Sequence, residues 1–180
     1  MAGTFVLAVV GDDSALYRLV FLIHVLTVIV GFGSSFVYPV LGREAQARRG
    51  AEAKALVESS MKATAILTTP WIYAAGVSGF VLVLMSDLID FKEAWISIAL
   101  GLFTVAVTFA AAVHLPNLRR MNALVAELAA APPGGGGGRP PQADELEQRG
   151  QRAAMYGGIF HLMFLALLVD MIWKPGSLFT

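Results

Sequence analysis

Two histidines lie inside long apolar stretches of the sequence, where an imidazole could take part in chemistry. His24 lies in the run RLVFLIHVLTVIVGFGSSFVYPVLG, and His161 lies in YGGIFHLMF. An imidazole in such surroundings can hydrogen-bond to a neighbouring helix, bind haem iron or a metal ion, or relay protons. Hydrogen bonding needs only a Ser or Thr on a neighbouring helix, and it is the favoured interpretation. Iron ligation and proton transfer remain open alternatives.

The composition predicts the elements that position these histidines. The chain has 180 residues, is 57% hydrophobic and only 14% charged, and has a mean hydropathy of +0.68. Average soluble proteins are about 45–50% apolar and about 25% charged. A helix needs about 20 mostly apolar residues to cross the hydrocarbon layer, and four segments qualify: 16–41, 61–85, 94–115 and 154–173. We therefore expect an all-α fold, an antiparallel bundle of four transmembrane helices in a single membrane domain covering residues 1–180.

The distribution of Lys and Arg predicts how the chain is oriented. Ten of the 13 basic residues fall in or beside two connections, the one after the first span and the one after the third. Positively charged connections stay on the cytoplasmic side of a membrane. We therefore expect a multi-pass protein of the bacterial cytoplasmic membrane, with both long connections in the cytoplasm and both termini outside.

Outside the spans, the composition of three parts of the chain predicts their structure. Residues 131–142, APPGGGGGRPPQ, combine five glycines with prolines and are expected to form a flexible tether. The Ala- and Glu-rich stretches next to the two long connections predict helix that continues beyond the membrane. The apolar residues 1–12 are expected either to lie on the membrane surface or to form a frayed tail.

Small and polar residues recur along the spans at intervals of three and four, and they predict the faces that pack together. The predicted packing residues are Thr27, Gly31, Gly33, Ser34, Ala75, Gly79, Gly101, Gly157 and Gly158. In the third span the stripe consists of Ser97, Gly101, Thr104, Thr108 and Ala111. His24 belongs to the stripe of the first span, so its imidazole is expected to face the bundle interior.

The depths of the two histidines argue against one haem between them. At a rise of 1.5 Å per residue, His24 lies about 4–5 Å from the middle of its span on the outer side. His161 lies about 4 Å from the middle on the cytoplasmic side, so the two Cα atoms differ in height by about 8–9 Å. The tilt of side chains toward each helix N-terminus separates the rings further. Two axial ligands need nearly the same depth, so the pair fits poorly, although small errors in the span limits would rescue it.

The remaining polar residues of the spans have ordinary interpretations. His114 is expected at the cytoplasmic interface. Asp170 is expected to pair with Lys174, four residues later, at the outer edge. Pro70 is expected to kink the second span.

The sequence predicts no catalytic residue and no metal-binding set. Acidic and basic residues balance at 13 each, which gives no basic field for a nucleic acid partner. Cys is absent, which removes disulfides, thiolate metal sites and a cysteine nucleophile. The nucleophile elbow and the H-E-x-x-H motif are absent as well.

The segment FLIHVLTVIVGFG resembles the first helix of a family of predicted bacterial integral membrane proteins of unknown function (domain of unknown function 2269). His24 and Gly33 fall on the His and Gly positions of that family, whereas Gly31 stands where the family usually has Trp. The resemblance implies a four-helix bundle. It also implies distant kinship with copper-resistance membrane proteins and with the membrane-bound, haem-containing protoporphyrinogen oxidase. On that kinship His24, and less strongly His161, would be ligands of haem b.

Three functions remain in competition. The favoured one is a non-enzymatic structural or accessory subunit that lies in the lipid bilayer and assembles with itself or with other membrane proteins. The second is a haem-binding redox protein related to protoporphyrinogen oxidase, although no intramembrane Lys matches the second ligand of that enzyme. The third is a permease for a small solute or an ion, suggested by the Thr and Ser residues of the predicted inner faces.

Overall fold

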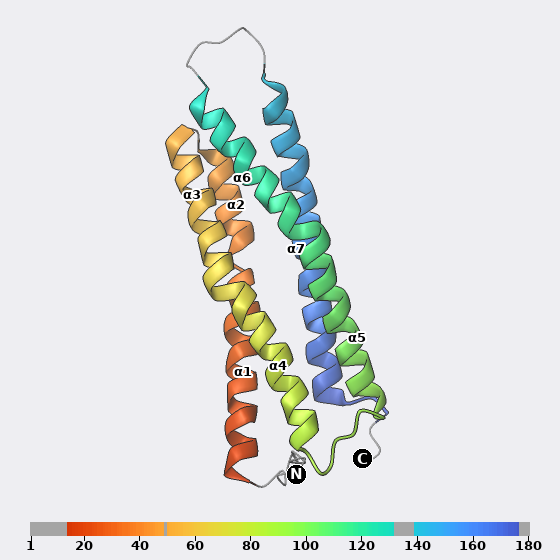
Figure 1. The fold of residues 1–180 in the computed structure, drawn as a ribbon. Coiled ribbons are helices and arrows are strands. Elements are labelled where there is room, and N and C mark those ends of the chain that lie inside the picture. Colours follow the sequence, from red (N-terminus) through yellow and green to blue (C-terminus); the bar gives the residue numbers. More distant parts are fainter. Residues whose placement is uncertain (1–13, 49, 132–138, 177–180) are drawn as a thin grey trace, which may run out of the picture.

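The computed structural model describes residues 14–48, 50–131 and 139–176, most of which lie in long helices (Figure 1). Four helical segments are long and apolar enough to cross a membrane: Ala15–Ala47, Gly50–Met85, Ala94–Ala130 and Pro141–Trp173. The prediction of an all-α, antiparallel four-helix membrane fold is confirmed. Residues 1–12 and most of the predicted tether, 132–138, lie outside the described residues.

The second and third of the four segments each contain a π-helical turn, and the first consists of two separate helices. The first consists of α1 (Ala15–Ser35) and α2 (Tyr38–Ala47). The second consists of α3 (Gly50–Ala63), the π-helical turn η1 (Thr64–Thr68) and α4 (Thr69–Met85). The third consists of α5 (Ala94–Phe109), the π-helical turn η2 (Ala110–His114) and α6 (Leu115–Ala130). The fourth is the uninterrupted helix α7 (Pro141–Trp173).

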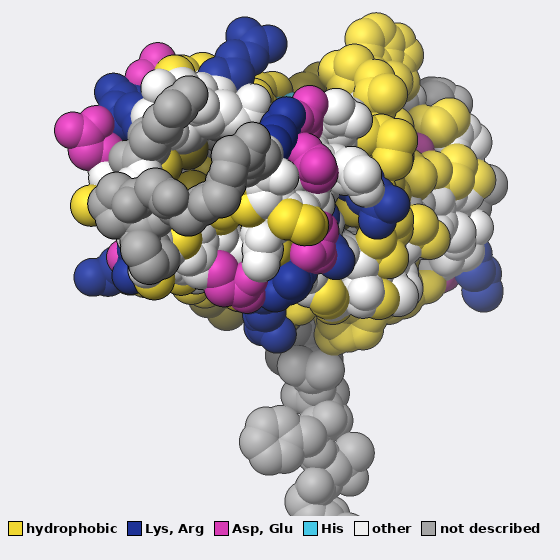
Figure 2. Space-filling model, turned by 90° about the horizontal axis from the view of Figure 1, so that it is seen from above, with side chains coloured by type: hydrophobic (Ala, Val, Ile, Leu, Met, Phe, Trp, Pro, Cys, Tyr) yellow, Lys and Arg dark blue, Asp and Glu magenta, His cyan; other side chains and the backbone are white. Residues whose placement is uncertain are grey.

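Each segment is longer than the hydrocarbon layer is thick. A helix of 33 residues is about 50 Å long, against about 30 Å of hydrocarbon. The charged side chains of all four segments concentrate toward one end, which we call the charged half: α2, α3, α6 and residues 141–153 of α7. The rest, which we call the apolar half, contains α1, α4, α5 and residues 154–173 of α7. Seen from the charged end, Lys, Arg, Asp and Glu side chains are spread over the surface (Figure 2). The helices predicted to continue beyond the membrane are present, and the span limits within them remain predictions.

Both π-helical turns lie just before a proline. Pro70 and Pro116 each occupy the first turn of the following helix. A proline inside a helix has no N–H to donate, and its ring clashes with the carbonyl four residues earlier. A wider turn relieves this conflict: the N–H of Thr69 donates to Thr64 O, and the N–H of Leu115 donates to Ala110 O. The disturbance expected at Pro70 is therefore a π-helical turn, and a second one precedes Pro116.

The apolar half is built from two helix pairs. In Figure 1, α1 runs beside α4, and α5 runs beside α7. Aromatic side chains connect the pairs: Phe32 stacks on Phe164 with ring centroids 4.4 Å apart, and the ring of Phe103 lies against Gly76. In the charged half α2, α3, α6 and α7 pack together, with Leu124 fully buried.

A charged network joins α6 to α7 in the charged half. Glu145 accepts hydrogen bonds from Arg120 at 2.9 and 3.1 Å and from Arg149 at 2.8 Å. Arg149 also donates to Asn117 Oδ1. The hydrogen bonds from Arg120, and then those from Arg149, lower the pKa of Glu145 from its usual 4.5 to about 2. The two arginines thus stabilise the ionised form of Glu145, which links α6 to α7.

Replacement of this carboxylate is expected to destabilise the charged half in a pH-dependent way. Because the pKa is lower in the folded protein, the stabilisation is fully present above pH 4.5 and is lost as the pH falls toward 2. Glu145→Gln should therefore lower the melting temperature at pH 7, and the difference from wild type should shrink over that interval. The control is Glu52→Gln, an exposed acid without an ion-pair partner among the described residues. An equal, pH-independent loss in both variants would contradict this role.

Candidate functional site

Polar side chains of the apolar half gather where α1 packs on η1 and α4. We call this set the polar seam: His24, Thr27, Ser34, Tyr38, Thr68 and Ser78. The buried residues of α1 are His24, Thr27 and Gly31, and all three lie on the face that was expected to point inward. The seam therefore runs along the contact between the first two long segments.

His24 is bound to α4. Its Nδ1–H group donates to the carbonyl of Ala75 at 3.0 Å and lies 3.1 Å from Ser78 Oγ. The hydroxyl of Ser78 donates to the carbonyl of Ala74 at 2.7 Å. A Cβ atom at Gly79 would lie only 3.0 Å from His24 Cε1, so the glycine makes room for the ring. The imidazole thus takes up the first role considered for it, a hydrogen bond to a neighbouring helix.

Three hydroxyl groups continue the seam toward the charged half. Ser34 Oγ lies 2.8 Å from Thr68 Oγ1, and the hydroxyl of Tyr38 also reaches Thr68 Oγ1. Ser34 donates to the carbonyl of Gly31 at 3.0 Å. These contacts form one consistent chain in which Tyr38 donates to Thr68, Thr68 to Ser34, and Ser34 to a carbonyl. Every hydroxyl of the chain has a donor role, as hydroxyls excluded from water require.

Gly31 lets the backbones of α1 and α4 approach closely. A Cβ atom at this position would lie 2.9 Å from the backbone nitrogen of Ile72 and 3.1 Å from the carbonyl carbon of Trp71. Backbone atoms of a helix cannot move aside singly, so only glycine fits here without shifting a helix. Gly33, two residues away, has no described atom within 4 Å of its Cβ position.

Several glycines predicted to pack have open space where a Cβ atom would lie. Besides Gly33, these are Gly101, Gly157 and Gly158, whose Cβ positions also have no described atom within 4 Å. The stripe of the third span lies on the exposed side of α5. The buried face of α5 instead carries Trp95, Ile96 and Ala99. In this helix Trp95, Ile96 and Ala99 fill the contact, and the Ser, Thr and Gly residues of the predicted stripe do not.

Gly76 is a close contact that sequence reasoning missed. A Cβ atom there would lie 2.5 Å from the ring of Phe103 on α5. The signal in the sequence was the concentration of small residues between Ala74 and Gly79. The prediction named only Ala75 and Gly79 of these as packing residues. Gly76 thus allows the α1–α4 pair to contact the α5–α7 pair.

His161 lies far from His24 and faces a different helix. Its Nε2 lies 3.2 Å from Ser35 Oγ, and its ring stacks on Phe36 at 4.2 Å between centroids. Ser35 follows His24 by 11 residues on α1, which corresponds to about 16 Å along the helix. The separation in depth is thus larger than the sequence predicted. His114 packs edge-on against Tyr156 and Phe160 on another side of α7.

The residues present do not fit a haem held between His24 and His161. Axial ligands approach the iron from opposite faces at one depth, whereas these imidazoles lie about 16 Å apart along α1. Across residues 14–48, 50–131 and 139–176, no three His, Asp or Glu side chains are grouped so that they could hold a metal ion. The seam supplies hydrogen bonds between helices and no ligand set for that group.

The C-terminal end of α7 differs from the expected pairing of Asp170 with Lys174. Lys174 has a left-handed backbone (φ 44°), and its Nζ lies over the ring of Trp95 at 5.3 Å from the centroid. Both carboxylate oxygens of Asp170 are buried without a hydrogen-bond partner among the described residues. Glu93, which was not singled out from the sequence, is buried and accepts a hydrogen bond from Trp95 Nε1.

Comparison with known proteins identifies a family. The family model described as "Predicted integral membrane protein (DUF2269)" matches residues 18–175, which include all of the four long segments except residues 15–17 of the first. Comparisons with curated proteins and with solved structures give no match. The resemblance carried by His24 and Gly33 thus extends over nearly the whole chain. The chain belongs to the DUF2269 family of predicted integral membrane proteins.

Proposed function

We propose that the protein is a non-enzymatic structural or accessory subunit of the bacterial cytoplasmic membrane. The observation that supports this role is the environment of His24, the imidazole with the strongest claim to chemistry. Its Nδ1 is used by the carbonyl of Ala75 and the hydroxyl of Ser78, and its ring fills the space left by Gly79. Through these contacts the imidazole of His24 holds α1 against α4.

The proposal includes an orientation and a mode of assembly. The charged half is assigned to the cytoplasm because it carries most of the Lys and Arg residues. A subunit of this kind would assemble with itself or with other membrane proteins. Many large hydrophobic side chains are exposed, including Leu22, Ile29 and Val105, which offers a surface for lipid and for partner helices.

The structural role of His24 is tested by spectroscopy together with stability. Protein purified from haem-replete cells is expected to show no Soret band. His24→Ala is expected to lower the free energy of unfolding by about 1–3 kcal/mol, because it removes a buried hydrogen bond and leaves a cavity. Ile23→Ala, at the neighbouring exposed position, should cost much less.

Two results would contradict the structural role of His24. A Soret band that disappears in His24→Ala would overturn the proposal and favour the haem-binding alternative. So would a His24→Ala variant as stable as wild type, since the imidazole would then have no structural task.

A further inference from the structure

Four basic side chains of the charged half have no ion-pair partner among the described residues. They lie one on each long segment: Arg43 in α2, Lys62 in α3, Arg119 in α6 and Arg152 in α7. All four are exposed. We call these four residues the basic ring.

Contacts between the segments place the basic ring at one level. The hydroxyl contact between Tyr38 and Thr68 sets the register of the first two segments, and the ring contact between His114 and Tyr156 sets that of the last two. From these contacts the four basic residues are four to six residues away toward the charged end. At 1.5 Å per residue this is about 6–9 Å.

A third contact sets the register between the first and the fourth segments, and so places the two pairs of basic residues relative to each other. Ser35 on α1 and His161 on α7 lie within hydrogen-bond distance. Counted from these residues, Arg43 is eight positions away and Arg152 is nine, or about 12 and 14 Å. The four residues therefore lie at about one level just beyond the apolar half, where the headgroups of a bilayer begin.

The other basic residues of the charged half behave differently. Each of those that the structure describes is paired with an acid of the protein: Arg48 with Glu44, Lys54 with Glu58, Arg120 with Glu127 and Glu145, Arg139 with Asp144 and Glu147, and Arg149 with Glu145. The protein thus neutralises these cations itself and leaves the basic ring for a partner outside the chain.

A shallow hollow on α7 suggests what that partner is. Arg152 lines it together with Gln148, Gln151 and Met155, and its volume is about 340 Å³. A guanidinium and two side-chain amides are donors suited to a phosphate group. Met155 lies on the side of the apolar half, where an acyl chain would begin.

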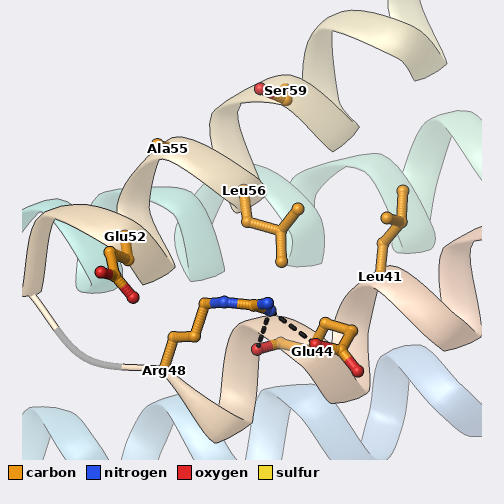
Figure 3. A pocket seen from close by; sticks show the side chains of 7 residues that line it. All are labelled: Leu41, Glu44, Arg48, Glu52, Ala55, Leu56 and Ser59. Atoms are coloured by element: carbon orange, nitrogen blue, oxygen red, sulfur yellow. Dashed lines mark hydrogen bonds and ion pairs between the residues drawn. The ribbon is translucent and has the colours of Figure 1, made fainter.

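A second hollow, between α2 and α3, serves as a contrast (Figure 3). There the guanidinium of Arg48 is held by the side chain and the carbonyl of Glu44, and Glu52 lies on the facing helix. An anionic group would meet two carboxylates in that hollow and only one cation, which is already neutralised. Charge complementarity therefore favours the hollow at Arg152.

We propose that the basic ring binds the phosphate groups of anionic phospholipids in the leaflet that surrounds the charged half, with the hollow at Arg152 as its best-formed site. Each Lys or Arg near an anionic membrane surface strengthens binding by about fivefold. The ring thereby fixes the depth of the bundle in the bilayer. This assignment depends neither on the proposed structural role of His24 nor on which side of the membrane is the cytoplasm.

The test compares two double variants with the same change in charge. Detergent-purified protein is titrated with phosphatidylglycerol and with phosphatidylcholine, and bound lipids are counted by native mass spectrometry. Wild type is expected to bind phosphatidylglycerol more tightly. Arg119→Gln with Arg152→Gln should weaken that binding at least fivefold. Arg48→Gln with Arg139→Gln, which removes two cations already paired within the protein, should change it less than twofold.

Two outcomes would overturn the assignment. One is equal binding of the two lipids by wild type. The other is an equal loss in both double variants, which would show a general effect of charge. The melting temperature in phosphatidylcholine alone provides the folding control: since Arg119 and Arg152 have no partner among the described residues, their replacement should leave it unchanged.

Discussion

Gly31→Ala is expected to destabilise the protein, whereas Gly33→Ala is expected to leave it as stable or make it more so. A methyl group at residue 31 would meet the backbone of α4 at 2.9 and 3.1 Å, so one helix has to move. Such overpacking costs about 1–3 kcal/mol. At residue 33 the methyl group meets no described atom within 4 Å, and alanine is the better helix former by up to about 1 kcal/mol. The two variants should therefore differ in sign.

The measurement is unfolding of both variants in the same detergent, followed by tryptophan fluorescence. Trp71 belongs to the stretch of α4 that Gly31 contacts, so its contribution to the emission, alongside those of Trp95 and Trp173, responds to the separation of α1 from α4. Equal stability of the two alanine variants, or a larger loss at residue 33, would show that α1 does not approach α4 through Gly31.

The inner face of the first span could be predicted from the sequence because His24 needs a partner on another helix. His24 cannot face lipid without leaving its ring N–H unsatisfied, and Thr27 and Ser34 share its face by helical periodicity. The same reasoning placed Ala75 on the inner face of the second span, and it is buried there. Where a stripe contains groups that must hydrogen-bond, periodicity alone identifies the buried side.

The same reasoning does not predict the buried face of the third span. Its Thr and Gly residues have the same spacing, yet they lie on the exposed side of α5, and Trp95 and Ile96 are buried instead. A Thr in a helix can satisfy its hydroxyl within its own helix, so a stripe of Thr and Gly does not oblige a helix to turn that face inward. Which face of α5 is buried depends on its partner helix. On α7, Tyr156 and Phe160 pack against Phe109.

Relative depth was the least predictable property. The sequence suggested a difference of about 8–9 Å between His24 and His161, and the structure gives about 16 Å along α1. The register between two helices is set by contacts such as the stacking of Phe36 on His161 and of Phe32 on Phe164. No pattern within either helix encodes those contacts. For the same reason the position of Lys174 over Trp95 could not be anticipated.

Oxidative cross-linking of Ser34→Cys with Thr68→Cys tests the polar seam most directly. The sequence contains no Cys, so every disulfide formed is the engineered one. The hydroxyl oxygens at these positions lie 2.8 Å apart, which places the two Cβ atoms within reach of a disulfide. A matched control is Ser35→Cys with Thr68→Cys, because the side chain of Ser35 points to His161 on α7.

The reaction is carried out in native membranes, with a protease site inserted between α2 and α3 so that only a disulfide keeps the fragments together. The pair at residues 34 and 68 is expected to cross-link nearly completely, and the pair at residues 35 and 68 to remain reduced. If the control pair cross-links instead, or if neither does in folded protein, then α1 does not meet η1 and α4 through this seam, and the structural role proposed for His24 is lost with it.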